Sequence, residues 1–328
     1  MKLLLAALRI LPPEFAHSIA LNSLEILYRL KLIGIFFPNR FTNVPFTFKG
    51  LYFKNKLGIA AGLDKNGDFI NSLGALGFGF IEVGTITPKS QPGNPKPRVF
   101  RFKDQEAIVN SLGFNNKGVD YLVKKIKGRK YNGVLGINIG ANKDSVGQRR
   151  IDDYVECFQK VAAYADYIAV NISSPNTPDL RSLHLKENFL PLFESIKNLR
   201  IAEKFINPIF IKLSPDEDDY TISEITKAIK AFNFDGVITS NTTIDKSNLI
   251  FSSNANIAGG LSGKPLLKKS NEILALVHSN SPELLKIGVG GVHSKETFNM
   301  KIEKGASLVQ IYTSFIYHGP SIINELLD

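Results

Sequence analysis

The stretch Asn171–Pro178, which reads NISSPNTP, combines two amides, three hydroxyls and two prolines within eight residues. It overlaps the end of Tyr167–Ile172, a short apolar and β-branched run that is typical of a buried strand. Side chains just past a buried strand are held firmly yet stay open to a ligand. The stretch therefore predicts a loop that binds a planar polar ligand and takes part in proton transfer. An ordinary turn is the alternative.

A lysine and several glycines follow other apolar runs. Lys212 lies inside the run Ile209–Leu213, where a charge is costly unless it meets an anion or a polar ligand. A lysine that only extends to the rim of the strand is the alternative. The glycine-rich stretches Gly259–Gly263 and Gly288–Gly291 offer backbone N–H groups that can surround a phosphate.

The elements that must position these side chains are short strands that alternate with helix-length segments. The predicted strands are Leu57–Ala60, Phe80–Val83, Val134–Ile139, Tyr167–Ile172, Ile209–Leu213, Gly236–Ser240, Lys286–Val289 and Leu308–Tyr312. The predicted helices include Asp153–Ala165, Ser223–Phe232 and Lys268–His278. Eight such units predict an α/β fold, a (β/α)8 TIM barrel with its chemistry at the C-terminal strand ends. The long insertions Thr87–Lys130 and Asn241–Lys264 are expected to be loops at that face.

The N-terminal 40 residues follow a different pattern. Apolar residues recur at helical spacing over Phe15–Ile35, Pro13 suits the first position of a helix, and basic residues outnumber acidic ones. This amphipathic helical extension could lie in a membrane interface or pack on the barrel. No stretch before Arg40 is long and uncharged enough to span a bilayer. We expect a helical segment over residues 1–40 and a barrel domain over 41–328, joined near Phe37–Val44.

Composition narrows the possible partners. The chain has 328 residues and a net charge of +10, but no Lys/Arg-rich block, so nucleic acid is not an expected partner. Anionic lipid or acidic small molecules remain compatible with the charge. Cys157 is the single cysteine, which excludes a disulfide within the chain, and no metal site is predicted.

Five motifs together resemble those of the dihydroorotate dehydrogenases. They are Gly62–Lys65, Gly93–Pro95 with Pro97 and Arg98, Gly113–Asn116, Asn171–Pro178 and Gly288–Gly291. The likeness runs from about Phe46 to the C-terminus, and the helical extension resembles the quinone-dependent, membrane-associated class. The resemblance implies an FMN enzyme that oxidises (S)-dihydroorotate to orotate in de novo pyrimidine (UMP) biosynthesis, with a membrane quinone as the final acceptor. It also implies a peripheral location on the anionic, cytoplasmic face of the inner membrane.

The resemblance assigns roles to individual residues. Ser174 matches the catalytic base, for which the soluble class uses a cysteine, and we expect a proton relay through Thr177 or a water. Substrate-binding positions are Lys65, Asn110, Ser111, Leu112, Gly113, Phe114, Asn171, Asn176, Asn241 and Thr242. Cofactor-binding positions are Ala61, Gly62, Leu63, Asp64, Lys65, Thr85, Asn138, Asn171, Lys212, Ser240, Gly263, Gly290, Gly291, Tyr312 and Thr313. Positions that line the quinone tunnel are His17, Arg101 and Tyr312.

The sequence departs from the family pattern at three places. Ser111 stands where many relatives have a larger basic residue, Asp179 where glycine is usual, and Ser240 where threonine is common. None removes a catalytic group. Two other functions remain as alternatives: another phosphate-binding barrel enzyme such as an isomerase, and a non-enzymatic lipid- or ligand-binding module. A visible absorption spectrum of the purified protein separates them from a flavoenzyme.

Overall fold

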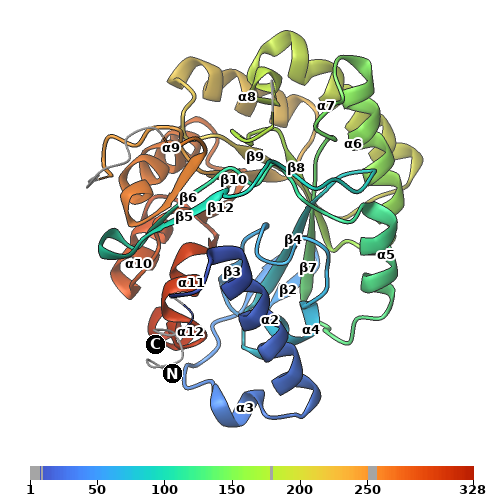
Figure 1. The fold of residues 1–328 in the computed structure, drawn as a ribbon. Coiled ribbons are helices and arrows are strands. Elements are labelled where there is room, and N and C mark those ends of the chain that lie inside the picture. Colours follow the sequence, from blue (N-terminus) through green and yellow to red (C-terminus); the bar gives the residue numbers. More distant parts are fainter. Residues whose placement is uncertain (1–7, 9, 178–179, 250–256) are drawn as a thin grey trace.

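Eight short apolar segments form a closed barrel of parallel strands in the computed structural model, which describes residues 8, 10–177, 180–249 and 257–328 (Figure 1). The strands are β3 (Leu57–Ile59), β4 (Phe80–Ile86), β7 (Val134–Ile139), β8 (Tyr167–Asn171), β9 (Ile209–Leu213), β10 (Gly236–Thr239), β12 (Leu285–Val289) and β13 (Leu308–Ile311). All are buried, as expected for parallel strands covered by helices. The predicted (β/α)8 barrel is confirmed.

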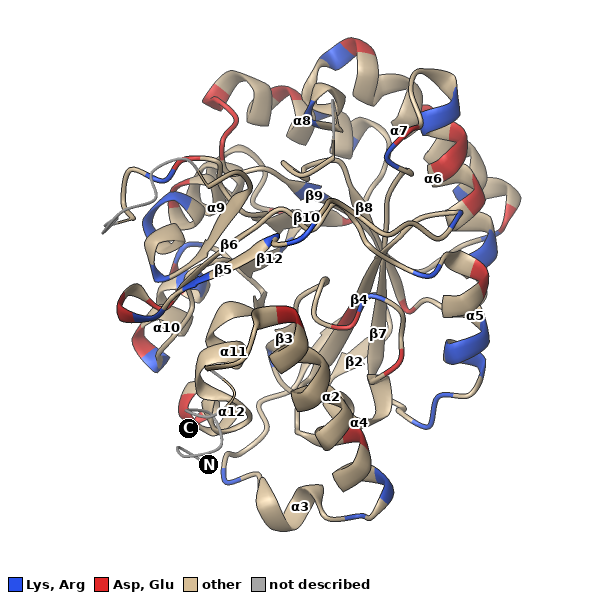
Figure 2. Cartoon of the chain, viewed as in Figure 1, with Lys and Arg blue, Asp and Glu red and all other residues tan. Residues whose placement is uncertain are grey.

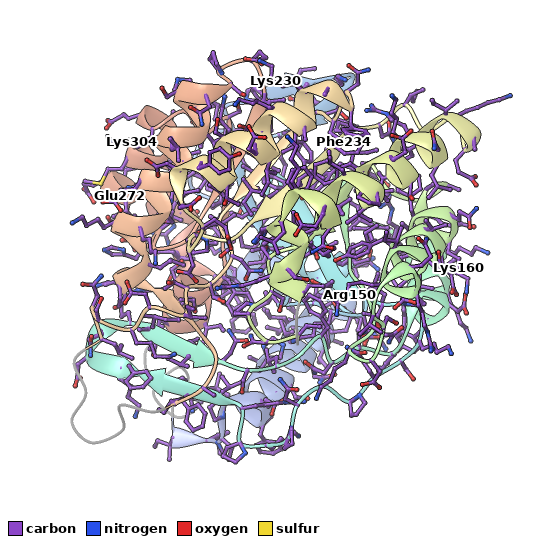
Figure 3. All side chains as sticks on the ribbon, turned by 90° about the horizontal axis from the view of Figure 1, so that it is seen from above. Arg150, Lys160, Lys230, Phe234, Glu272 and Lys304 are labelled. Atoms are coloured by element: carbon purple, nitrogen blue, oxygen red, sulfur yellow. The ribbon has the colours of Figure 1, made fainter. Side chains whose placement is uncertain are left out.

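Helices surround the barrel and bury their apolar faces against it. They are α4 (Ile70–Ala75), α5 (Val119–Lys127), α6 (Gln148–Val161), α7 (Lys186–Ala202), α8 (Asp219–Ala231), α9 (Leu267–Asn280), α10 (Lys295–Glu303), α11 (Thr313–His318) and α12 (Ser321–Leu327). Seen from above, charged side chains such as Lys230, Glu272 and Lys304 lie at the outer edge (Figure 3). The three predicted helices exist with shifted ends; α6, for example, begins at Gln148 rather than Asp153.

The prediction that the two long insertions are loops was wrong in part. The first contains α5 and two strands, β5 (Val99–Phe102) and β6 (Ala107–Asn110), and the second contains β11 (Gly260–Gly263). These strands form a separate antiparallel sheet in the order β11-β6-β5. Short 3-10 helices lie between other elements: η1 (Lys103–Gln105) between β5 and β6, η2 (Leu180–His184) before α7, and η3 (Lys264–Leu266) after β11. Because β6 and β11 are distant in sequence, their pairing leaves no local signal.

A small hairpin closes the end of the barrel where the strands begin. It consists of β1 (Phe46–Phe48) and β2 (Leu51–Phe53), which pair antiparallel. The Phe53 ring meets Phe80, the first residue of β4, edge to face at a centroid distance of 5.5 Å. The barrel is therefore sealed with aromatic side chains at this end and offers its polar groups at the other.

The N-terminal segment forms α2 (Pro13–Arg29) and α3 (Ile33–Phe36), with Pro13 at the first helical position as predicted. Leu21 and Leu24 of α2 are buried, and the helix contacts α4 and β5. Other apolar side chains of the two helices are exposed, among them Phe15 and Ile26 of α2 and Ile35 and Phe36 of α3. No helix in the described part of the chain is both long and apolar enough to cross a bilayer.

Candidate active site

A cavity of about 150 Å³ lies at the C-terminal ends of the barrel strands. It brings together most of the site residues predicted from the sequence. These are Ala61, Gly62, Lys65, Thr85, Asn110, Leu112, Gly113, Phe114, Asn171, Ser174, Asn176, Lys212, Ser240, Asn241, Thr242, Gly263, Gly290, Gly291, Tyr312 and Thr313. The barrel and its insertions thus gather residues spread over some 250 positions of the chain.

Four of the predicted substrate- and cofactor-binding residues do not line this cavity. Asn138 lies behind it, where it accepts a hydrogen bond from the Thr85 hydroxyl at 2.6 Å. The buried Asp64 accepts hydrogen bonds from nearby backbone N–H groups, the shortest from Phe69 at 2.7 Å, while burial raises its pKa to about 6. The Ser111 carbonyl accepts a hydrogen bond from Asn94, and Leu63 faces a second cavity. Asn138 and Asp64 therefore support the lining rather than form it.

The amide side chains form a connected network. Asn171 donates to the Thr85 hydroxyl at 3.0 Å, and its own carbonyl oxygen accepts from the Ser173 hydroxyl at 3.1 Å. Asn241 donates to the Ser173 hydroxyl at 3.1 Å. The Tyr154 hydroxyl, from α6, donates to the backbone carbonyl of Asn171 at 2.6 Å. The network fixes two amides at the cavity in one orientation, as recognition of a planar polar ligand requires.

Ser174 faces the cavity from the loop after β8. Its hydroxyl oxygen accepts from the Asn176 backbone N–H at 3.3 Å, and the Asn176 side chain donates to Asn110 at 3.2 Å. Thr177, in the same loop, is buried, and its hydroxyl has no hydrogen-bond partner within the described ranges of the chain. A buried hydroxyl without a partner is unusual and marks a place where a further polar group fits.

Lys212 lies buried in β9, next to Asn171 of β8 in the strand register. Burial lowers its pKa, and the negative charge of Glu82 acts in the opposite direction. Glu82 is itself buried inside the barrel and accepts hydrogen bonds from Asn138 and Tyr167, both at 2.8 Å. The ammonium group thus lies at the cavity with a carboxylate as its countercharge, rather than reaching into solvent.

Lys65 follows the glycine turn after β3 and donates to the Gly62 carbonyl at 2.8 Å. Burial lowers its pKa to about 8, although the nearby Glu14 carboxylate opposes this effect. Glu14, on α2, forms an ion pair with Arg98 at 2.8 Å. A lysine with a lowered pKa gives up its proton more readily than an exposed one, and an anion bound beside it would favour its charged form.

The turn that contains Gly290 and Gly291 forms part of the cavity wall. Gly290 and Gly291 have φ angles of +103° and +80°, a region that favours glycine. A Cβ on Gly291 would lie 2.3 Å from the backbone of Leu267, so only glycine lets the turn approach α9 so closely. The first turns of α9 and α11 also begin here, which adds backbone N–H groups suited to an anion.

Three polar residues at the cavity were missed by sequence reasoning: Ser262, Gln310 and Ser314. Gln310 lies in β13 and, like Lys212, is a polar residue in an apolar strand, so the same signal could have found it. Ser262 lies in the stretch Gly259–Gly263, which was predicted for its backbone N–H groups, but its side chain was not named because β11 was not predicted as a strand. The Ser314 hydroxyl and one Gln310 oxygen are buried without partners among the described residues.

A second cavity, of about 260 Å³, lies between α2 and the barrel. Its walls are mostly apolar, and His17, Arg101 and Tyr312 converge on it although they are distant in sequence. Burial and the charge of Lys65 lower the pKa of His17 to about 4, and burial raises that of Tyr312 to about 12. Lys65 and Tyr312 line both cavities, so the two lie side by side.

Comparison with known proteins yields one consistent family. The family model described as dihydroorotate dehydrogenase matches residues 44–328. Proteins named dihydroorotate dehydrogenase (quinone) from Saccharophagus degradans and Cellvibrio japonicus are 47% and 46% identical, covering 97% and 95% of this chain and 95% and 93% of their own. The crystal structure of DHODH in complex with ferulenol from Eimeria tenella aligns with a TM-score of 0.83 at 33% identity, covering 93% of this chain and 89% of that one.

Proposed function

Because the chain belongs to the dihydroorotate dehydrogenase family, we propose that it oxidises (S)-dihydroorotate to orotate in de novo pyrimidine biosynthesis, with a quinone as the final electron acceptor. One observation carries the proposal. One cavity, beside the glycine turn Gly290–Gly291, is lined by Ser174, by the amides of Asn171 and Asn176 and by the buried Lys212.

FMN fits this cavity better than a flavin without a phosphate. Gly290, Gly291 and Gly263 line the cavity and offer open backbone to a phosphate. The Ser314 hydroxyl, which has no hydrogen-bond partner among the described residues, lines the same cavity. Lys212, Thr85 and Asn171 would hold the ring. When bound, FMN would accept the hydride that leaves the substrate.

The remaining residues would bind the substrate and move its proton. Asn110, Asn171, Asn176 and Asn241 present amide groups to the pyrimidine ring, and the ammonium group of Lys65 attracts its carboxylate. The Ser174 hydroxyl would take the proton from carbon. Since a serine is a weak base, the proton must pass on. The Thr177 hydroxyl, which has no hydrogen-bond partner among the described residues, lies in the same loop to receive it directly or through a water.

The second cavity suits the quinone. It is apolar, is walled by α2, and meets the first cavity at Lys65 and Tyr312. His17, kept neutral by its lowered pKa, and Arg101 would bind the polar head of the quinone. The residue range 1–40 would then act as a docking segment for the barrel domain, 41–328, at the anionic cytoplasmic face of the inner membrane.

The surface of the segment supports this docking. Apolar side chains on α2 and α3 are exposed, with Ile35 at 73% and Phe36 at 59%. The ribbons of α2, α3 and α11 carry few charged residues, whereas α5, α6 and α7 carry many (Figure 2). Lys31 and Arg40 flank α3 and are exposed, as suits contact with anionic headgroups.

An absorption spectrum of the purified protein followed by an anaerobic titration tests the proposed function. We expect a yellow protein whose visible absorption bleaches on addition of dihydroorotate and returns on addition of a quinone. Mass spectrometry of the released group should identify FMN. A colourless protein that gains no colour with added FMN would exclude the proposal and return the phosphate-binding isomerase as the leading alternative.

A further inference from the structure

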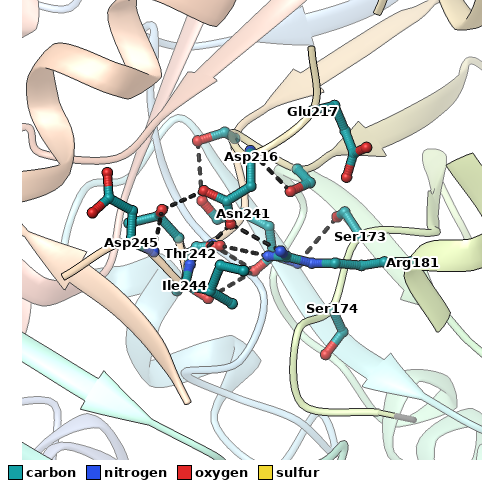
Figure 4. Close-up of polar contacts among 12 residues, drawn as sticks. Ser173, Ser174, Arg181, Asp216, Glu217, Asn241, Thr242, Ile244 and Asp245 are labelled. Carbon is teal, nitrogen blue, oxygen red and sulfur yellow. Dashed lines mark hydrogen bonds and ion pairs between the residues drawn. The ribbon is translucent and has the colours of Figure 1, made fainter. Parts of the chain in front are cut away.

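Two consecutive acidic residues, Asp216 and Glu217, follow β9, and their carboxylates contact the segment that follows the loop carrying Ser174. Figure 4 shows the contact of Asp216 with Arg181. Arg181 forms an ion pair with Asp216 at 2.9 Å, and His184 lies 2.6 Å from Glu217. Both partners belong to the 3-10 helix η2, in which residues three apart lie on the same side. The two carboxylates therefore hold η2 at two points along one face.

Asp216 also holds the loop that carries Asn241 and Thr242. It accepts hydrogen bonds from the Thr243 hydroxyl and, at 2.9 Å, from the Ile244 backbone N–H. Arg181 makes a second link, since it donates to the backbone carbonyl of Thr242 at 3.3 Å. One carboxylate and one guanidinium thus connect the loops after β8, β9 and β10, as Figure 4 shows.

The connection is buried and strongly charged. The Asp216 side chain is 8% exposed and also pairs with Lys269 of α9 at 2.7 Å. Burial raises the pKa of its carboxyl, but hydrogen bonds from Lys269, Thr243 and Ile244 outweigh burial and hold that pKa below its usual range. The carboxylate is therefore charged and multiply bonded, which makes it a rigid junction.

Separate contacts hold the loop between Ser174 and η2. The Asn94 side chain donates to the Asn176 carbonyl at 3.1 Å, and Asn176 donates to Asn110. Thr177 lies between these contacts and η2. Neither Arg181 nor Asp216 lines the cavity, so any effect they have on the reaction must pass through the loops they hold.

We propose that Arg181 and Asp216 are positioning residues, which couple the loop that carries Ser174 to the loop that carries Asn241 and Thr242. The coupling keeps the proposed base, Ser174, at a fixed distance from these substrate-binding side chains. The inference rests on the proposed function, because it assigns Ser174 the proton transfer. Misplacing a reacting group by about 1 Å can slow a step by about 10²-fold. The coupling therefore acts on the rate of the proton and hydride transfer more than on binding.

The test uses the full-length protein with FMN bound. In Arg181→Met, the rate of flavin bleaching by dihydroorotate should fall by about 10- to 10²-fold. The FMN content, the reduction potential and the affinity for orotate should stay close to those of the unchanged protein. Arg181→Lys keeps the charge for Asp216 but not the second nitrogen for Thr242, so it should recover part of the rate. The double variant Arg181→Met/Asp216→Asn should be no slower than the slower single variant.

Arg200→Met is the matched control. Arg200 pairs with the buried Asp235 at 3.1 Å, at the opposite end of the barrel, with exposure close to that of Arg181. It should lower stability and leave the bleaching rate unchanged. The inference fails if Arg181→Met bleaches at the normal rate, or if Arg200→Met slows bleaching equally. If the unchanged protein is not bleached by dihydroorotate, it is the proposed function that fails.

Discussion

At the scale of single residues, Ser174 gives a direct test of the proton transfer. Ser174→Ala removes the hydroxyl at the cavity but leaves the proposed phosphate site at Gly290 and Gly291 unchanged, so FMN should stay bound. A general base contributes about 10²–10⁴-fold, and flavin bleaching by dihydroorotate should slow by that range. Stopped-flow absorbance measures the rate, with dithionite reduction as the control. Bleaching at the unchanged rate would remove Ser174 from the mechanism.

Lys212 tests the electrostatics of the same cavity. Its ammonium group is buried beside Asn171 and should stabilise negative charge on the reduced flavin. Lys212→Met should therefore lower the flavin reduction potential or abolish FMN binding. A potentiometric titration of the variant checks this. An unchanged potential at full FMN occupancy would contradict the assignment.

Lys301 predicts a pH dependence of stability. Its side chain is fully buried, its amine donates to the Ser270 hydroxyl at 2.6 Å, and burial lowers its pKa to about 7 from 10.5. Between these two values the unfolded chain binds the additional proton, so this residue makes the free energy of unfolding rise with pH, by at most about 1.4 kcal/mol per unit. Below pH 7 both states are protonated and the slope vanishes.

Lys301→Met removes this contribution while other groups titrate as before. Denaturant unfolding of both proteins across the same pH window measures it. The stability of the unchanged protein relative to the variant should rise as pH increases from about 7. A constant difference would show that Lys301 is charged, or equally neutral, in both states over that range.

Sequence reasoning found the residues that stand out against an apolar strand or follow its end. Lys212 and Asn171 are of this kind, and both lie at the cavity. It could not distinguish residues that line the cavity from residues that hold the lining in place. Asn138 and Asp64 carry polar side chains at strand ends, yet Asn138 bonds to Thr85 and Asp64 to backbone N–H groups. Which way a side chain points depends on neighbours distant in sequence.

At the scale of elements, the eight barrel strands were predictable because each is a short apolar run flanked by helix-length segments. The sheet of β5, β6 and β11 was not. Two of its strands pair across a long separation in the chain: Gly260 of β11 pairs with Asn110, some 150 positions earlier. Two of the four residues of β11 are glycines, which local propensity assigns to a turn rather than a strand.

The turn after β12 provides a test at this scale. Gly291→Ala would place a Cβ 2.3 Å from the Leu267 backbone in addition to straining a φ of +80°. Gly50 has nearly the same φ, +78°, but open space around it. Gly50→Ala should therefore cost only the conformational strain of about 1–2 kcal/mol, whereas Gly291→Ala should cost more and weaken FMN binding. Thermal unfolding and FMN titration of both variants compare them; equal effects would mean that the close approach is not needed.

At the scale of the whole molecule, the two cavities meet only because the N-terminal helices pack on the barrel. His17 comes from α2, Arg101 from β5 and Tyr312 from the end of β13. Their convergence was expected from the family resemblance, and nothing in local sequence pattern could have placed them together. Both N-terminal helices, α2 and α3, also expose apolar side chains at the molecular surface.

That surface leads to the last prediction, for the variant Ile35→Ser/Phe36→Ser. Both side chains are more than half exposed, so the fold and the bleaching by dihydroorotate should be unaffected. Full burial of such a side chain in lipid is worth about 1.5–3 kcal/mol, so binding to anionic liposomes should weaken strongly. Oxidation by a long-chain quinone in those liposomes should slow, while a short, soluble quinone should still work.

Ile201→Ser/Ile206→Ser is the control for lost apolar surface. These residues are 68% and 84% exposed, and they lie at and just beyond the end of α7, which is remote from α3 in Figure 1. A docking surface confined to the N-terminal helices requires that this control bind liposomes normally. If both double variants lose binding equally, the attraction is a general property of the basic protein. If neither does, α3 packs beside the barrel without meeting lipid, and the quinone must enter the second cavity by another route.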